Sequence, residues 1–212
     1  MHRALLSWSL TKASAPGEEA FAASCLPRLE RAVPRNRRGA ALARNLIGDE
    51  RWAARYVGAR ALGRLAPEPI ALDEAWAGLL TLAGDRERTV REGAAAGLAE
   101  LVTRVPEAAP RLERVLTDPA ADAGARRAAV RSLIVLSVQP QTAELGARLL
   151  RAAALAGDRS GRGLGAGVIG RGIAAQDRDR ALGIAREWAA SAEPALRAQG
   201  ERALRGPLAG AA

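Results

Sequence analysis

Apolar and small residues recur along this chain with a period of 35 or 36 residues, and each recurrence contains an arginine at the same place. The five marker arginines are Arg55, Arg91, Arg126, Arg162 and Arg197. A small residue lies three positions after each of them, at Gly58, Ala94, Ala129, Gly165 and Gly200. An aliphatic residue lies seven positions after each, at Leu62, Leu98, Leu133, Ile169 and Leu204. Because these offsets fall on one face of an α-helix, the pattern predicts five equivalent amphipathic helices.

A second set of amphipathic segments alternates with these helices. The predicted partner helices span residues 35–47, 72–83, 108–116, 142–155 and 178–190. Gly and Pro residues separate the segments, and two of the turns contain Gly48-Asp49 and Gly84-Asp85. An aspartate after such a glycine is expected to cap the next helix. A degenerate sixth copy of the marker helix lies one period earlier, with Glu19 in place of the arginine. Such a departure is expected in a terminal repeat, which caps the stack.

The alternation predicts an all-α fold, a right-handed α-solenoid of about six two-helix repeats with a period near 35 residues. We call the first helix of each repeat the A helix and the second, which carries the marker arginine, the B helix. Residues 15–208 would form this single domain, with an N-terminal cap segment at 1–14 and a disordered tail at 209–212. Apolar residues make up 49% of the chain but aromatic residues only 3%, so Ala and Leu dominate and favour closely packed helices.

The turns carry a further regularity, an aspartate six residues before the marker arginine, at Asp49 with Arg55 and at Asp85 with Arg91. This pattern resembles the HEAT repeat of the armadillo-type solenoids. The resemblance implies a ladder in which such aspartates and arginines bond across neighbouring repeats, and we expect Arg91 to hold the Asp85 carboxylate. It also implies that the B helices line a concave surface that binds a partner.

Charge and rare residues limit the functions that this chain can have. The net charge of +9 and pI near 11.3 suit nucleic acid, an anionic membrane surface or an acidic protein as partner. One Cys excludes an intrachain disulfide, and one Cys with one His excludes a His/Cys zinc site. The one histidine, His2, is not a usable catalytic base, so we expect no His-based triad. No apolar run has the length of a membrane span. We therefore expect a cytoplasmic protein without cofactor, metal or membrane.

Basic residues just off the marker positions form the predicted binding site. Two walls of a basic groove are expected, one from Trp52, Tyr56, Arg60 and Arg64, and the other from Arg127, Arg131, Arg171 and Arg202. The first four lie at spacings of four on one helix, where aromatic and arginine side chains together suit stacking on bases. The alternative interpretation is a solvated charged face, with the aromatic residues filling the junction between repeats.

A glycine-rich stretch at 160–172 contains Gly165-x-Gly167-x-x-Gly170. No predicted strand precedes it, so the nucleotide-binding interpretation of this motif is weak. The repeat register places it inside a B helix, where glycines allow either very close helix packing or the approach of a partner's backbone. Of these two, the packing interpretation is favoured.

Size, arginine content and HEAT-like repeats also resemble the bacterial DNA alkylation repair glycosylases. The Trp-x-x-x-Asp element of that family has no match here, because Lys12, Tyr56, Leu80 and Ala192 follow the four tryptophans at that spacing. The sequence therefore predicts a binding scaffold without catalytic activity that engages a partner protein on its concave surface. The alternative is binding of DNA through the basic groove, with a glycosylase-like repair activity as its enzymatic form.

Overall fold

The computed structural model describes residues 17–32, 37–64, 69–156, 164–206 and 208–209, which form helices and contain no strand. The predicted all-α class is therefore confirmed for this part of the chain. The chain divides into two compact units, Met1–Ala108 and Ala109–Ala212, and each is described here by itself. The predicted cap segment 1–14, the marker Arg162 and tail residues 210–212 lie outside the described residues.

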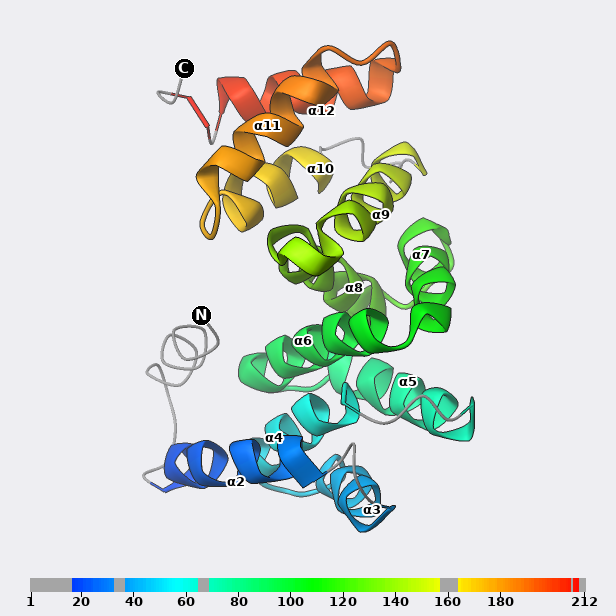
Figure 1. Cartoon of the computed structure of the whole chain (residues 1–212), viewed down its shortest axis with the longest axis vertical. Helices are drawn as coiled ribbons and strands as arrows, with labels where there is room; N and C mark the ends of the chain where they lie inside the picture. The colour runs from blue at the N-terminus through cyan, green and yellow to red at the C-terminus, as the bar shows by residue number, and fades with distance from the viewer. Residues whose placement is uncertain (1–16, 33–36, 65–68, 157–163, 207, 210–212) are drawn as a thin grey trace. The chain divides into compact units, whose positions relative to one another are not determined.

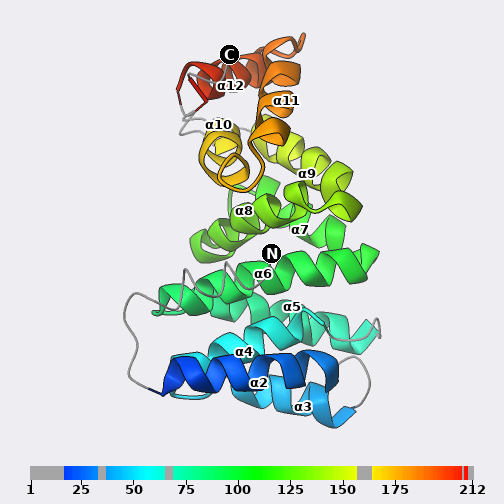
Figure 2. The ribbon, with the colours of Figure 1, turned by 60° about the vertical axis from the view of Figure 1, so that its left-hand side comes forward.

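The described part of the first unit contains five helices, which lie at the predicted places. They are α2 (Glu18–Ala32), α3 (Arg37–Leu46), α4 (Trp52–Leu62), α5 (Pro69–Ala83) and α6 (Arg88–Arg104). The B helices α2, α4 and α6 pack side by side in sequence order (Figures 1 and 2). The A helices α3 and α5 pack against α4, and α5 also packs against α6. The unit therefore has two layers, one of A helices and one of B helices.

The second unit repeats this arrangement. Its A helices are α7 (Ala109–Thr117), α9 (Ala143–Leu155) and α11 (Arg178–Ala189). Its B helices are α8 (Ala123–Val138), the short α10 (Leu164–Gly167) continued by the π-helical segment η3 (Val168–Ile173), and α12 (Pro194–Arg205). The segment η3 contacts both α8 and α12, so the three B helices form one layer (Figure 1).

Small residues allow the B helices to pack closely. A Cβ atom added to Gly97 of α6 would lie 2.5 Å from the carbonyl oxygen of Ala59 in α4. The aliphatic position seven residues after the marker is fully buried in four repeats, at Leu62, Leu98, Leu133 and Ile169. The repeated pattern of small and aliphatic residues therefore produces the core, as the sequence predicts.

Packing also accounts for two glycines of the glycine-rich stretch. A Cβ atom on Gly165 would lie 2.6 Å from the Trp188 ring, and one on Gly172 would lie 2.5 Å from Cδ1 of Ile134. These contacts join α10 to α11 and η3 to α8. The packing interpretation is thus the one that the structure favours for both positions.

The capping prediction for the turn aspartates is wrong. Asp49 and Asp85 instead accept hydrogen bonds from the backbone N–H groups two residues later, of Arg51 at 2.9 Å and Glu87 at 2.8 Å. Both carboxylates lie too far before their helices to cap them, and they stabilise the turn itself. Side-chain caps occur at two other helices. Asp122 accepts a hydrogen bond from the backbone N–H of Ala125 in α8, and Asp177 accepts one from the backbone N–H of Arg180 in α11.

Candidate partner-binding surface

The marker Arg55 has a structural role. Its Nε and Nη2 donate to the two carboxylate oxygens of Asp85, at 2.7 and 3.1 Å. Its Nη1 donates to the carbonyl oxygens of Asp49 and Glu50 at 2.9 and 2.7 Å. The Arg55 and Asp85 side chains are only 10% and 9% exposed, so the pair joins the turns of two successive repeats in a largely dry setting.

Other marker arginines bind the carbonyl oxygens of their own turns. Arg91 donates to Asp85 and Arg86, and Arg197 donates to Ser191 and Ala192. The expectation that Arg91 holds the Asp85 carboxylate is therefore wrong, because Arg55 of the preceding repeat already holds it in a two-bond arrangement. The described marker arginines are consequently turn-stabilising groups.

The pKa of Asp85 predicts an acid-sensitive contribution to stability. Burial alone would raise the pKa of Asp85, but hydrogen bonds from Arg55 and the Glu87 N–H bring it below its ordinary value. The stabilisation is therefore complete above about pH 4, the unfolded pKa, and is lost as pH falls through the lower folded pKa. In urea unfolding, the stability difference between wild type and Asp85→Asn should be largest near pH 7 and should shrink below about pH 4. A difference that stays constant down to pH 2 would contradict this role.

The four residues of the first predicted wall do not form an exposed stacking surface. Tyr56 is only 6% exposed, and its ring lies where a Cβ atom on Gly93 of α6 would be 2.6 Å from Cδ2. Trp52, Arg60 and Arg64 are half-buried. Tyr56 thus fills the junction between two B helices, which is the alternative that the sequence left open.

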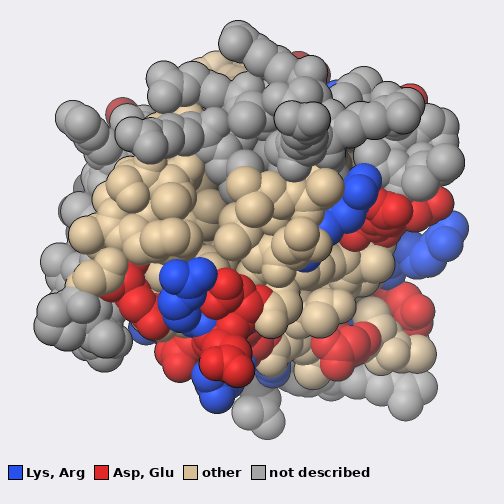
Figure 3. Space-filling model, turned by 90° about the horizontal axis from the view of Figure 1, so that it is seen from below, with Lys and Arg blue, Asp and Glu red and all other residues tan. Residues whose placement is uncertain are grey.

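Acidic side chains lie among the arginines of the first unit. Glu100 of α6 is 3.6 Å from Arg64 and 2.7 Å from Arg104, and Glu92 is 2.7 Å from Arg88. Basic and acidic side chains also lie next to one another among uncharged residues on the face that Figure 3 shows. The described part of this unit therefore presents mixed charge.

The second predicted wall lies wholly in the second unit. Arg127 on α8, Arg171 on η3 and Arg202 on α12 are exposed, and Arg131 on α8 is half-buried. On α8 the buried stripe includes Ala125, Ala129 and Leu133, opposite the side that carries the arginines. We call Arg127, Arg131, Arg171 and Arg202 the arginine face. Ile134 of α8 packs against Gly172 of η3, so these two helices lie next to each other.

Charge is distributed unequally between the B layers of the two units. In the second unit, α8, α10–η3 and α12 contain seven arginines and one acidic residue, Glu201. In the first unit, α2, α4 and α6 contain seven arginines and five glutamates. The excess positive charge of the B helices is thus concentrated in the second unit, where it favours an anionic partner.

Partly exposed aliphatic side chains lie between these arginines. Val130, Ile134 and Val135 of α8 are all half-buried and neighbour Arg127 and Arg131 along the helix. Such a mixture of arginine and apolar side chains is common at protein–protein interfaces. The arginine face therefore combines positive charge with apolar surface.

Sequence reasoning missed a pocket of about 560 Å³ between the A helices α9 and α11. Three arginines, Arg148, Arg151 and Arg180, contribute to its lining. The spacing of three between Arg148 and Arg151 places them on neighbouring turns of one helix, which was the available signal. That spacing alone does not show the space between α9 and α11 in which the pocket lies.

Other functional groups are scarce in the described part of the chain. No cluster of three or more His, Cys, Asp or Glu side chains there could hold a metal ion. Cys25 is a half-buried free thiol. None of the described helices combines the length and the apolar character that crossing a bilayer requires.

Comparisons with known proteins identify no family. No protein-family profile and no curated protein matches the chain. Three solved structures, all described as engineered proteins of the Northeast Structural Genomics Consortium, align with 18%, 17% and 16% identity. The alignments cover 96%, 96% and 97% of this chain and 97%, 95% and 68% of the other, with TM-scores of 0.37, 0.39 and 0.37. Because these TM-scores lie below 0.5, no property of the engineered proteins is transferred to this chain.

Proposed function

We propose that this chain is a HEAT-like α-solenoid that acts as a non-catalytic scaffold and binds an acidic segment of a partner protein. The 35-residue period, the alternation of A and B helices, and the Arg55–Asp85 pair between successive repeats support the repeat architecture. The observation that carries the function is the arginine face, whose four arginines lie on neighbouring B helices that contain one acidic residue, Glu201.

The surroundings of these arginines favour a protein partner. Aliphatic side chains lie between the arginines of α8, and they would contact apolar side chains of a peptide. The first unit offers little for base stacking, because Tyr56 is buried and Arg64 lies beside Glu100. A scaffold that recognises acidic and apolar residues together fits both observations.

Binding of nucleic acid is the second candidate, and the same excess of arginine supports it. Contact with phosphates requires distributed cations rather than a single motif, and Arg127, Arg171 and Arg202 are exposed on three helices. A repair glycosylase has less support, since the chain lacks the Trp-x-x-x-Asp element of that family. The two binding candidates make different predictions for defined probes.

A peptide titration distinguishes them. We expect a fluorescent peptide of alternating Glu and Leu to bind the wild-type protein, with affinity that falls as salt is raised. The variant Arg127→Ala/Arg171→Ala/Arg202→Ala should bind it at least about tenfold more weakly, because three complementary charges are lost. Fluorescence anisotropy at low salt measures both affinities, with a random DNA duplex as the competing probe.

The matched control removes three arginines from exposed positions on the A helices of the same unit. Arg114, Arg178 and Arg186 are exposed there. Their triple alanine variant has the same net charge as the arginine-face variant and should keep wild-type affinity. If both variants lost the same amount of peptide affinity, the effect would come from net charge alone. If the protein bound duplex DNA tightly and did not bind the peptide, the partner would be nucleic acid and not a protein.

A further inference from the structure

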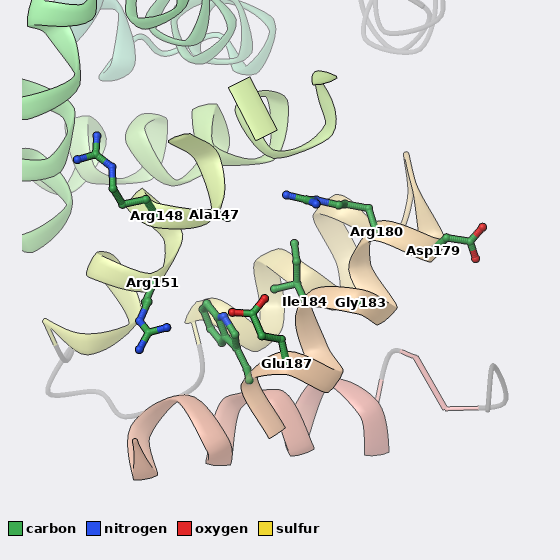
Figure 4. A pocket seen from close by; sticks show the side chains of 9 residues that line it. Ala147, Arg148, Arg151, Asp179, Arg180, Gly183, Ile184 and Glu187 are labelled. Carbon is green, nitrogen blue, oxygen red and sulfur yellow. The ribbon is translucent and has the colours of Figure 1, made fainter. Parts of the chain in front are cut away.

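The pocket between α9 and α11 lies on the A helices of the second unit, whereas the arginine face lies on the B helices. Its lining includes Arg151 from α9 and Arg180, Ile184, Glu187 and Trp188 from α11 (Figure 4). A volume of about 560 Å³ is within the range of sites that hold small molecules. The pocket therefore merits a functional interpretation of its own.

The apolar part of this pocket is rigid. Trp188 and Ile184 are 3% and 5% exposed, so core packing fixes both side chains. The Trp188 ring packs against Gly165 of α10, where a Cβ atom would lie 2.6 Å from Cζ3. By contrast, a Cβ atom on Gly183 would meet nothing within 4 Å, which leaves open space at the lining. A bound molecule would thus meet a preformed apolar surface.

The polar part of the pocket is mainly cationic. Arg180 extends from α11 toward α9 in Figure 4, and its Nη2 donates to the carbonyl oxygen of Ala143 at 3.3 Å. Its Nε is buried and has no hydrogen-bond acceptor among the described residues. Asp179 points away from Arg148 and Arg151 in Figure 4. The lining contains three arginines, Arg148, Arg151 and Arg180, and two acidic residues, Asp179 and Glu187, so it carries one positive charge in excess.

We propose that this pocket binds a small amphiphilic anion, whose carboxylate or phosphate group is held by Arg180 and whose apolar part lies against Ile184 and Trp188. Guanidinium groups suit both oxyanions because their N–H donors match the paired oxygens of either group. Among the described residues the Arg180 guanidinium donates to the carbonyl oxygen of Ala143 at 3.3 Å, and a bound oxyanion would add a charged acceptor for its other N–H donors. The proposal goes beyond the scaffold function and does not depend on it.

Fluorine NMR of protein labelled with 5-fluorotryptophan gives a direct test. The Trp188 resonance is assigned with the variant Trp188→Phe. Octanoate and octyl phosphate should each shift it saturably, whereas the Trp52 and Trp76 resonances should not move. The relative affinities of these two probes identify the preferred oxyanion. Octylamine, with the same apolar chain and the opposite charge, should produce no shift.

Two variants locate the binding, and each addresses a different feature of the pocket. Arg180→Met should weaken octanoate or octyl phosphate binding at least about tenfold, as expected when a charge-assisted hydrogen bond is lost. Arg178→Ala, which removes an exposed arginine two residues away, should leave binding unchanged. Gly183→Leu should block the pocket while keeping every arginine, and its exposed helical position tolerates a side chain.

The possible results separate clearly. Loss of the Trp188 shift in both Arg180→Met and Gly183→Leu, with Arg178→Ala unaffected, supports the proposal. The absence of any shift with either anionic probe would overturn it, as would an equal shift with octylamine. The proposal would also be overturned if inorganic phosphate shifted the Trp188 resonance and octyl phosphate bound no more tightly, because the apolar part of the pocket would then contribute nothing to binding. None of these results depends on Arg127, Arg171 or Arg202, so failure here leaves the scaffold proposal intact.

Discussion

Arg55→Ala should destabilise the protein by about 3–5 kcal/mol, the typical effect of removing one partner from a buried ion pair. The reason is that Asp85, 9% exposed, would lose the two hydrogen bonds from Arg55 while remaining buried. The carbonyl oxygens of Asp49 and Glu50 would lose a donor at the same time. Chemical unfolding followed by circular dichroism measures the change.

The control is Arg88→Ala, which removes an ion pair that lies on the surface and has a comparable nitrogen–oxygen distance. Arg88 lies 2.7 Å from Glu92 on the same helix and is 64% exposed. Exposed pairs of this kind contribute less than about 1 kcal/mol. Equal destabilisation by Arg55→Ala and Arg88→Ala would mean that burial does not strengthen the pair between repeats.

Gly200→Ala should lower stability by about 3 kcal/mol, because α12 packs against the backbone of α11 without space for a methyl group. An added Cβ atom would lie 2.4 Å from the backbone nitrogen of Ala189 and 2.7 Å from the carbonyl oxygen of Ala185. Neither atom belongs to a flexible side chain, so the two helices would have to separate. Thermal unfolding of the variant measures the cost.

Gly183→Ala provides the opposite case within the same helix pair. This glycine lies inside α11, and an added Cβ atom would meet nothing within 4 Å. Alanine there should stabilise the protein by roughly 0.5–1 kcal/mol through its higher helix propensity. If Gly200→Ala were as stable as Gly183→Ala, the close approach of α11 and α12 would be disproved.

The helices were predictable because one physical pattern determines them repeatedly. The aliphatic residues seven positions after the markers, such as Leu98 and Leu133, are buried as the period requires. The helix boundaries follow the Gly and Pro positions. The pairing of Asp85 was harder to predict, because Arg55 and Arg91 are both at suitable spacings and only three-dimensional geometry distinguishes them.

The site was less predictable, because helical spacing shows which residues share a face but not what covers that face. Tyr56 and Arg60 share a spacing of four, yet Tyr56 is covered by α6. Arg64 meets Glu100, which lies 36 residues away in the sequence. The spacing of Arg148 and Arg151 places them on neighbouring turns of one helix, but the pocket also depends on the gap between two A helices, which that spacing does not show.

Charge reversal on the arginine face tests the central proposal most directly. The variant Arg127→Glu/Arg171→Glu/Arg202→Glu should lose binding of the Glu/Leu peptide and should gain binding of a peptide of alternating Lys and Leu. Fluorescence anisotropy of the two labelled peptides, with wild type and the reversed variant, measures this exchange of preference. If the folded reversed variant still bound the acidic peptide with wild-type affinity, the arginine face would not be the binding surface.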